Sequence, residues 1–449
     1  MTTTALVRGA ARGATALRGG QFWRPTPFFV FGGLCWLLLT LAYWWVPMAY
    51  EYGLHAAVIE RLKVSLAHPR HPLVDLPGAG SPYLVSPYAM AEGLFARATG
   101  LTGWEVMKLA GPVNLLVLLT GLNRLVRTLT ARDGGSPARA EPRAWGRAPV
   151  LALLTLTLLW GTSTDWRTEP LALRSLTIDL GYPSTFAIGL AFWVWAAAWR
   201  LRREEARWAV AGLAAVGLVW LWPDTGPATP HVPWLALIGL PALWPRLRRD
   251  PRDPLVLLCA AGIAALGYAA LLHPSAYGAA MVLTVLPLQL ALAVALAAPR
   301  PWTRQRRALG GLAATGAALG LLATALDPPP SGPDYMWAAR HVPPGNVVLT
   351  DGHHAVRALP GHGPTLVAPA RPDPVVDRTD WDRRRAAVRA YLSPASTRTE
   401  RQDIADRYRV RWLLLDRDER LPPEAVLVAW GPRTGEVLAR VNGGTSRRG

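Results

Sequence analysis

The sequence predicts a mainly α-helical membrane protein, in which a polytopic domain of about nine spans, within two, precedes a small extracytoplasmic α/β domain. Of its 449 residues, 51% are hydrophobic and only 17% are charged, whereas about a quarter of the residues are charged in a typical soluble domain. The apolar residues are concentrated in nearly uncharged blocks that recur up to residue 326. Each block approaches the roughly 20 residues that cross a bilayer. A single soluble domain, a fibrous chain and a disordered chain are therefore excluded.

The net charge of +18 comes almost entirely from arginine, since Lys63 and Lys108 are the only lysines. A basic excess can indicate nucleic-acid binding. Much of this charge, however, lies in short loops between apolar blocks, where Arg and Lys mark the cytoplasmic side of a membrane. We therefore expect no nucleic-acid partner. Cys35 and Cys259 both lie inside apolar blocks, which excludes a disulfide framework and a cysteine metal cluster.

The first span is expected at residues 27–48, after a basic N-terminal segment, residues 1–26. A positive segment before an apolar run is also typical of a signal peptide, but this run ends in Tyr43, Trp44, Trp45 and Pro47 rather than in a small-residue cleavage site. We interpret it as an uncleaved span whose N-terminus is cytoplasmic. The membrane domain then extends over residues 27–326.

The remaining spans follow from the alternation of basic and non-basic loops. Basic loops lie at residues 124–147, 200–207, 246–252 and 300–307, and the intervening loops contain Asp, Glu, His, Pro and Trp instead. Because cytoplasmic loops collect Arg and Lys, the non-basic loops, the first of them residues 49–105, are expected outside. The predicted spans lie at about 108–128, 149–164, 182–200, 208–222, 233–245, 255–272, 277–298 and 308–326.

One segment of the first outer loop, residues 81–100, is less apolar than a span. Two Ser-Pro-Tyr triplets, residues 81–83 and 86–88, open it. Ser86 is a suitable N-cap, with Pro87 at the first helical position. Glu92 and Arg97 inside the helix weaken it as a span, so a re-entrant or interfacial helix is expected.

Residues 327–449 are expected to form the outer α/β domain, after a proline-rich linker that cannot continue a helix. Short β-branched and leucine-rich runs alternate with two helical stretches, and the second helix begins with Ser396, Thr397 and a reciprocating Glu400. The predicted strands are 346–350, 365–367, 410–415, 425–430 and 436–441, and the predicted helices are 380–392 and 396–409.

The first outer loop contains the main candidate site. Glu51 follows the first span directly, and within a helix it would share a face with His55. Leu54, Val58, Leu62 and Leu66 place an apolar stripe on this helix, which is expected to lie along the membrane. A carboxylate held partly out of water acquires a pKa suited to a general base. The alternative is that Glu51 is a hydrated residue that ends a span.

Further polar residues lie in the outer loops, and nearby cations are available for a phosphate. Arg61 and Lys63 are candidates to hold a phosphate or pyrophosphate leaving group. Groups from separate outer loops would converge on one site at the membrane boundary; the candidates are Asp165, Glu169, Asp224 and His231. Asp351, Gly352, His353 and His354 fit a strand-ending turn better than a metal site, so no metal ligands are assigned.

This arrangement resembles the GT-C class of multi-span glycosyltransferases, which includes protein mannosyltransferases and arabinosyltransferases. The shared features are the acidic residue after an N-in first span, the proline- and tyrosine-rich stretch 81–88, the long series of spans and a C-terminal outer α/β domain. Segments 334–351 and 404–415 are similar to parts of such outer domains. An acidic pair is frequent in this loop of the class, whereas here Glu51 is flanked by tyrosines.

The resemblance implies transfer of a sugar from a polyprenyl-phosphate donor, with inversion, to a cell-envelope acceptor at the outer face of the bacterial plasma membrane. Glu51 would be the base, His55 and the cations would contact substrate, and no cofactor other than a divalent cation is implied. Membrane lipid and the polyprenyl-phosphate sugar are the expected partners. The alternatives are a non-catalytic scaffold or lipid-binding membrane protein and, less favoured, a flippase or transporter.

Overall fold

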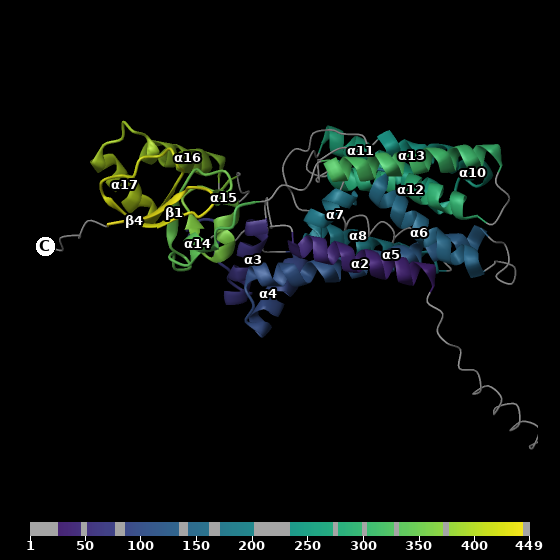
Figure 1. Cartoon of the computed structure of the whole chain (residues 1–449), viewed down its shortest axis with the longest axis horizontal. Coiled ribbons are helices and arrows are strands. Elements are labelled where there is room, and N and C mark those ends of the chain that lie inside the picture. The colour runs from purple at the N-terminus through teal and green to yellow at the C-terminus, as the bar shows by residue number, and fades with distance from the viewer. Residues whose placement is uncertain are drawn as a thin grey trace, which may run out of the picture.

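The computed structural model describes most of the chain as a helical bundle joined to a small sheet domain (Figure 1). The described residues are 26–45, 52–76, 86–133, 142–160, 171–201, 234–272, 277–298, 303–326, 332–370 and 377–442. The bundle comprises α2 (Pro27–Trp45), α5 (Gly103–Asp133), α6 (Pro142–Leu158), α7 (Leu173–Asp179), α8 (Pro183–Ala198), η2 (Trp234–Gly239), α10 (Leu240–Arg249), α11 (Pro254–Leu271), α12 (Tyr277–Ala297) and α13 (Arg304–Leu326).

Five of the described helices are long and apolar enough to cross a membrane. They are residues Pro27–Trp45, Gly103–Thr130, Pro254–Leu271, Tyr277–Ala297 and Arg304–Leu326. Helices α7 and α8 form a sixth candidate, bent by 113° between them. Helix α12 is buried on nearly all sides, and it packs against α6 and α11. A helix that is apolar all round belongs in the core of a bundle, so α12 is the central element.

The structure confirms a mainly helical chain with several potential spans and a small C-terminal sheet, while the number of spans stays a prediction. The expected span at 208–222 lies outside the described residues. At 233–245 the structure has the 3-10 helix η2 and the short helix α10 instead of one continuous apolar helix. Pro241 and Pro245 remove backbone donors there, which interrupts a regular hydrogen-bond ladder.

Two helices of the first loop, α3 (Tyr52–Val64) and α4 (Pro87–Thr99), pack together beside the bundle. As expected, Ser86 occupies the N-cap position of α4 and Pro87 its first turn, while Gly100 ends the helix in the left-handed region at φ 78°. Small residues of α4 face α3, and its outer face exposes Met90, Leu94 and Phe95. This exposed apolar face supports the interfacial placement of α4.

The apolar stripe of α3 packs within the protein, and the expected position of α3 along the membrane stays a prediction. Val58 and Leu62 are buried against Ala89 of α4, with Leu54 and Leu66 packed at the edge of the same cluster. A stripe with period four buries itself on whichever apolar surface is nearest. Here that surface is a neighbouring helix rather than lipid.

The C-terminal domain is a five-stranded mixed sheet with helices on both faces. Its strand order is β2-β1-β3-β5-β4, with β1 parallel to β2 and β3, and β5 antiparallel to β3 and β4. The strands are β1 (Val347–Leu349), β2 (Thr365–Leu366), β3 (Val410–Leu415), β4 (Ala425–Trp430) and β5 (Val437–Val441), and the helices are α14 (Met336–Ala339), α15 (Ala355–Ala358), η4 (Leu359–His362), α16 (Arg378–Leu392) and α17 (Arg398–Tyr408).

The predicted strands and helices of this domain are confirmed. Strands β3 and β4 have the expected bounds. Thr397 caps α17, because its hydroxyl accepts a hydrogen bond from the backbone N–H of Glu400 at 3.2 Å. Residues 351–354 form the expected turn after β1.

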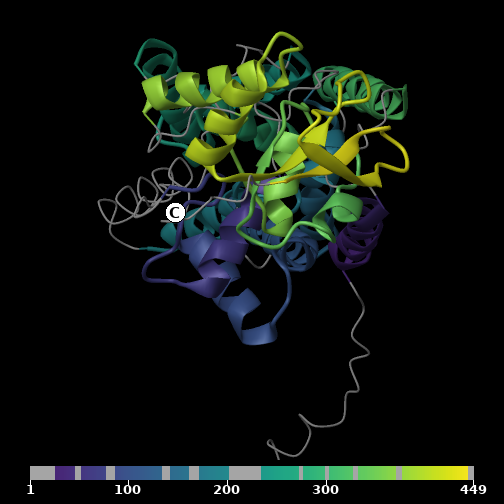
Figure 2. The ribbon, with the colours of Figure 1, turned by 90° about the vertical axis from the view of Figure 1, so that its left-hand side faces the viewer.

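The sheet domain docks on the first loop, at one end of the bundle (Figure 2). The segment around Val74 pairs in parallel with Leu366 of β2, and the Leu366 N–H donates to the Leu73 carbonyl at 2.7 Å. Gly53 at the start of α3 lies so close to α15 that a Cβ there would stand 2.0 Å from the Arg357 carbonyl oxygen. The first loop and the sheet domain therefore share one extensive interface.

Candidate functional site

Only three of the predicted site residues lie in the part of the chain that the structure describes. Glu51, Asp165, Glu169, Asp224 and His231 lie outside it. His55, Arg61 and Lys63 all belong to α3. The site is therefore built from α3 and from the described elements that pack against it.

Arg61 and Lys63 both bind backbone carbonyls, and they do so on different segments. The Arg61 guanidinium donates to the Gly363 carbonyl of the sheet domain at 3.3 Å. The Lys63 ammonium donates to the carbonyls of Gly100 and Leu101, each at 2.8 Å, where α4 ends. A cation at a helix C-terminus satisfies its last carbonyls. The two side chains thus do not converge on one point, and their role as phosphate ligands stays a prediction.

His55 and Tyr52 lie in an aromatic group with Tyr182. The Tyr52 and Tyr182 ring centroids are 4.5 Å apart, and His55 meets Tyr182 edge-on at 4.9 Å. The Tyr52 hydroxyl donates to the Ile178 carbonyl. Burial lowers the pKa of His55 to about 4, so this imidazole is neutral at neutral pH. His55 is thus suited to a hydrogen bond or a stacking contact rather than to holding a phosphate by charge.

This aromatic group lies where α7 ends and α8 begins. Asp179 is the last residue of α7, and it is 1% exposed. Its carbonyl accepts hydrogen bonds from the Tyr182 N–H and the Thr185 hydroxyl, both at 2.9 Å. Gly181 lies in the bend, where a Cβ would stand 2.4 Å from the Tyr43 hydroxyl. A broken helix frees backbone groups, and in membrane proteins such breaks are tolerated where they are buried in protein or line a cavity.

Asn114 of α5 connects this bend to α4. Its side-chain amide donates to the Leu180 carbonyl at 2.8 Å and to the Tyr88 hydroxyl at 2.8 Å. Tyr88 lies one helical turn before Glu92 on α4. Burial raises the pKa of Glu92 to about 8. A hydrogen bond from the neighbouring Tyr88 hydroxyl lowers this pKa, but by less than burial raises it. One carboxylate oxygen of Glu92 is buried and has no hydrogen-bond partner among the described residues.

These side chains form one group, which we call the tyrosine–carboxylate cluster. Glu92 and Asp179 are both close enough to the Tyr43 hydroxyl to act on it electrostatically, and Asp179 acts on Tyr52 as well. Its members come from α2, α3, α4, α5, α7 and the start of α8: Tyr43, Tyr52, His55, Tyr88, Glu92, Asn114, Asp179 and Tyr182.

The cluster contains groups suited to proton transfer and to hydrogen bonding of hydroxyls. A carboxyl with a pKa near neutrality, such as Glu92, can accept or donate a proton at neutral pH. The described residues include no group of three or more His, Cys, Asp or Glu side chains that could hold a metal ion. Glu51 directly precedes Tyr52 in the chain, so the predicted base adjoins the cluster in sequence.

Asp179 and Glu92 were not among the predicted site residues. In the sequence, Glu92 is a charged residue that weakens a predicted span, and Asp179 is one of several acidic residues in a predicted outer loop. An ionisable residue within an otherwise apolar helix is nevertheless a known indication of function in membrane proteins. That indication would have singled out Glu92, while the burial of Asp179 depends on contacts with α2 and α3 that are distant in sequence.

The raised pKa of Glu92 predicts an unusual pH dependence of stability. Burial raises the pKa of the Glu92 carboxyl from its ordinary value of 4.5 to about 8 in the folded state. Ionisation of this carboxyl therefore opposes folding increasingly as the pH rises from 4.5 to 8. Glu92→Gln should therefore raise the thermal midpoint at pH 8 by about 2–5 °C and leave it nearly unchanged at pH 4.5. Thermal unfolding of both proteins in the same detergent tests this. A variant less stable than the wild type at pH 8 would contradict it.

Comparisons of the chain with protein-family models, with curated proteins and with solved structures gave no match.

Proposed function

We propose that the chain is an integral membrane glycosyltransferase that moves a sugar from a polyprenyl-phosphate donor to a cell-envelope acceptor at the outer face of the plasma membrane. The observation that supports this best is the tyrosine–carboxylate cluster. It brings the buried Asp179, a buried carboxylate oxygen of Glu92 and several tyrosines together near the break between α7 and α8, beside the first loop in which Glu51 lies. Such a combination is suited to binding hydroxyls and accepting a proton.

The proposed reaction is a single displacement. The acceptor hydroxyl oxygen forms a bond to the anomeric carbon of the sugar on the side opposite to the phosphate. The carbon–oxygen bond to the lipid phosphate breaks, and the phosphate leaves with the bonding electrons. A carboxylate takes the hydroxyl proton, and Glu51 is the proposed base. In this proposal Asp179 and Glu92 set the electrostatic environment, and His55 and the tyrosines contact the sugar and acceptor.

The proposed orientation places the N-terminus in the cytoplasm and the sheet domain outside. The bundle supports it, because its basic helix ends lie away from the sheet domain. Helix α5 begins at the interface between the bundle and the sheet domain. There the ring centroids of Trp104 and of His362 in η4 are 5.1 Å apart. The 31 residues of α5 extend about 46 Å, and Arg124 and Arg127 lie near its far end. Helix α10, with Arg246, Arg248 and Arg249 in its last turn, also lies at that far end (Figure 1).

Cysteine labelling tests this orientation, because the chain has only two natural cysteines. In a variant with Cys35 and Cys259 replaced by alanine, Ala395→Cys should react with a membrane-impermeant maleimide on intact cells. Arg252→Cys should react only after the cells are opened. Both positions are exposed in the structure, so access depends on the side of the membrane. Labelling of Arg252→Cys alone on intact cells would contradict the proposed orientation.

Sugar transfer itself is tested with the full-length protein in proteoliposomes. Polyprenyl-phosphate donors with radiolabelled mannose, glucose or arabinose are supplied with a cell-envelope glycan extract as acceptor. The proposal predicts transfer of label from one donor to the glycan fraction, with release of polyprenyl phosphate in equal amount. Donors that remain intact with every acceptor fraction would contradict it.

A second candidate is a non-catalytic scaffold or lipid-binding membrane protein. Two observations favour it: the exposed apolar face of α4 and the use of Arg61 and Lys63 to join segments of the protein. Under this proposal the donor lipid binds to the purified protein, but its sugar is never released. The proteoliposome experiment separates the two, since only an enzyme transfers the label and releases polyprenyl phosphate.

A further inference from the structure

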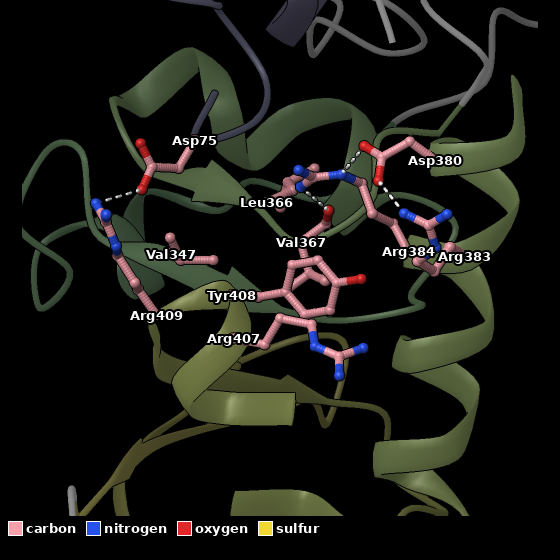
Figure 3. Close-up of a pocket in the computed structure, with 10 residues that line it drawn as sticks. All are labelled: Asp75, Val347, Leu366, Val367, Asp380, Arg383, Arg384, Arg407, Tyr408 and Arg409. Carbon is pink, nitrogen blue, oxygen red and sulfur yellow. Dashed lines mark hydrogen bonds and ion pairs between the residues drawn. The ribbon is translucent and has the colours of Figure 1, made fainter. Parts of the chain in front are cut away.

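A cavity of about 530 Å³ lies in the sheet domain, at its contact with the first loop (Figure 3). This volume falls within the range of about 300–1,000 Å³ that is common for small-molecule sites. Its walls come from β1, β2, α16, the end of α17 and the first loop, and its lining residues are Asp75, Val347, Leu366, Val367, Asp380, Arg383, Arg384, Arg407, Tyr408 and Arg409.

The lining has more guanidinium groups than carboxylates. Four arginines face two aspartates, so the cavity has a formal surplus of two positive charges. Asp380 forms ion pairs with two of the arginines, with distances of 2.7 Å to Arg384 and 3.6 Å to Arg383. A concave surface with one sign of charge concentrates its electric field inward. The surplus therefore favours a ligand with about two negative charges.

Arg384 forms the rigid base of this cavity. It is 8% exposed, it donates to the Val367 carbonyl at 3.0 Å, and its guanidinium lies 5.2 Å from the centre of the Tyr408 ring. Figure 3 shows that ring between Arg384 and Arg407. Because its position is held by a carboxylate, a carbonyl and a ring, Arg384 needs little reordering when a ligand arrives.

The other three arginines are accessible to a ligand. The Arg383 side chain is 61% exposed, and its guanidinium lies 3.6 Å from Asp380. Arg407 is exposed, and within the described part of the chain no carboxylate is paired with it. Arg409 forms a single exposed ion pair with Asp75 of the first loop, at 3.3 Å. Exposed ion pairs contribute only about 0–1 kcal/mol. A dianion can therefore compete with Asp75 for Arg409 at small energetic cost.

We propose that this cavity binds the phosphate or pyrophosphate group of a ligand about the size of a phosphorylated sugar. Guanidinium groups bind phosphate oxygens through paired hydrogen bonds. A phosphate monoester or a pyrophosphate also carries the two or more negative charges that the cavity favours, whereas a single carboxylate carries one. Arg383, Arg407 and Arg409 bind the anion, while Arg384 holds the cavity wall. The inference does not depend on sugar transfer, because it concerns the sheet domain and is measured by binding alone.

The test uses the full-length protein in lipid nanodiscs, titrated with inorganic pyrophosphate in a calorimeter. The wild type should bind pyrophosphate, and the double variant Arg383→Gln/Arg407→Gln should bind at least about 10-fold more weakly. Arg411→Gln is the matched control, because Arg411 is exposed on β3 and does not line the cavity. It removes one positive charge from the domain and should change the affinity less than 2-fold.

Asp75→Asn should change the affinity for pyrophosphate in the opposite direction. It removes a carboxylate from the lining and frees Arg409, so pyrophosphate should bind about 3- to 10-fold more tightly. A gain in affinity cannot come from misfolding. Unchanged affinity in the double variant, or equal losses in the double variant and Arg411→Gln, would overturn the proposal.

Two sources of the phosphate group are distinguished by further titrations. Glucose 1-phosphate represents a soluble ligand, and phosphatidic acid vesicles, added to the protein in neutral nanodiscs, represent a lipid headgroup with a terminal phosphate. Binding of either that is weakened in the double variant supports the cavity and identifies the source. No binding of pyrophosphate, glucose 1-phosphate or vesicles above that of the double variant would overturn the proposal.

Discussion

Replacing Glu51 with Gln is expected to reduce sugar transfer by at least about 100-fold, since a positioned general base contributes typically 10²–10⁴-fold to a rate. The amide has nearly the same shape as the carboxylate but cannot take the acceptor proton. The loss should appear in kcat, while KM for the lipid donor changes little. Steady-state transfer in proteoliposomes, with the amount of folded protein checked by gel filtration, gives both constants.

Glu105→Gln is the matched control for this substitution. Glu105, in the first turn of α5, is also a glutamate near the sheet-domain end of the bundle. It is exposed, and its carboxylate accepts hydrogen bonds from the backbone N–H and the hydroxyl of Thr102. Glutamine can serve the same capping role, so transfer should be retained. If Glu51→Gln keeps the wild-type kcat, Glu51 is not the base. If neither protein transfers sugar, the non-catalytic scaffold is favoured.

Asp179→Asn is expected to lower kcat by about 10- to 100-fold, which corresponds to a loss of roughly 1.4–2.7 kcal/mol of transition-state stabilisation. Asp179 is buried beside Tyr52 at the break between α7 and α8. A purely structural role predicts that stability falls with activity. A functional role predicts that activity falls while the thermal midpoint stays equal or rises, because a buried polar group that serves a site commonly lowers the stability of the fold.

Measuring kcat and the thermal midpoint on the same preparation separates these two roles. Asp382→Asn, at an exposed position of α16 outside the cavity lining, should change neither quantity. A loss of stability in Asp179→Asn that accounts for its loss of transfer would show that the cluster is a structural core and not a site.

Much of the sheet domain could be predicted from the sequence, because its signals are local. Strands β3 and β4 are bounded by turn residues and a helix C-cap, and α17 begins at a capping residue three positions before Glu400. The start of α4 follows in the same way from Ser86 and Pro87. Each signal depends on residues within a few positions of one another, so no tertiary contact is needed to recognise it.

The partners of α3 could not be predicted, since period and hydrophobicity do not say which surface a helix covers. Its apolar stripe lies on α4, and its first turn contacts α15, about 300 residues later in the chain. The pairing of Val74 with β2 is equally distant in sequence. Such contacts follow from the arrangement of the whole molecule.

Of the predicted site residues, His55 lies in the tyrosine–carboxylate cluster. The convergence of the outer loops on one site stays a prediction, because its other members lie outside the described residues. The contribution of Glu92 depends on burial among Tyr88, Asn114 and Tyr43 from three helices. A pKa shift of this kind arises from desolvation, which a sequence does not show before its helices are packed.

The proposed function requires the sugar donor to bind at the tyrosine–carboxylate cluster. Cryo-electron microscopy of the full-length protein in nanodiscs, prepared with a polyprenyl-phosphate sugar, can locate the donor. We expect density for the donor phosphate and sugar in contact with His55, Tyr182 and the α7–α8 break, with the lipid chain extending along the apolar helices. Donor density at another surface, with the cluster closed around its own side chains, would contradict it.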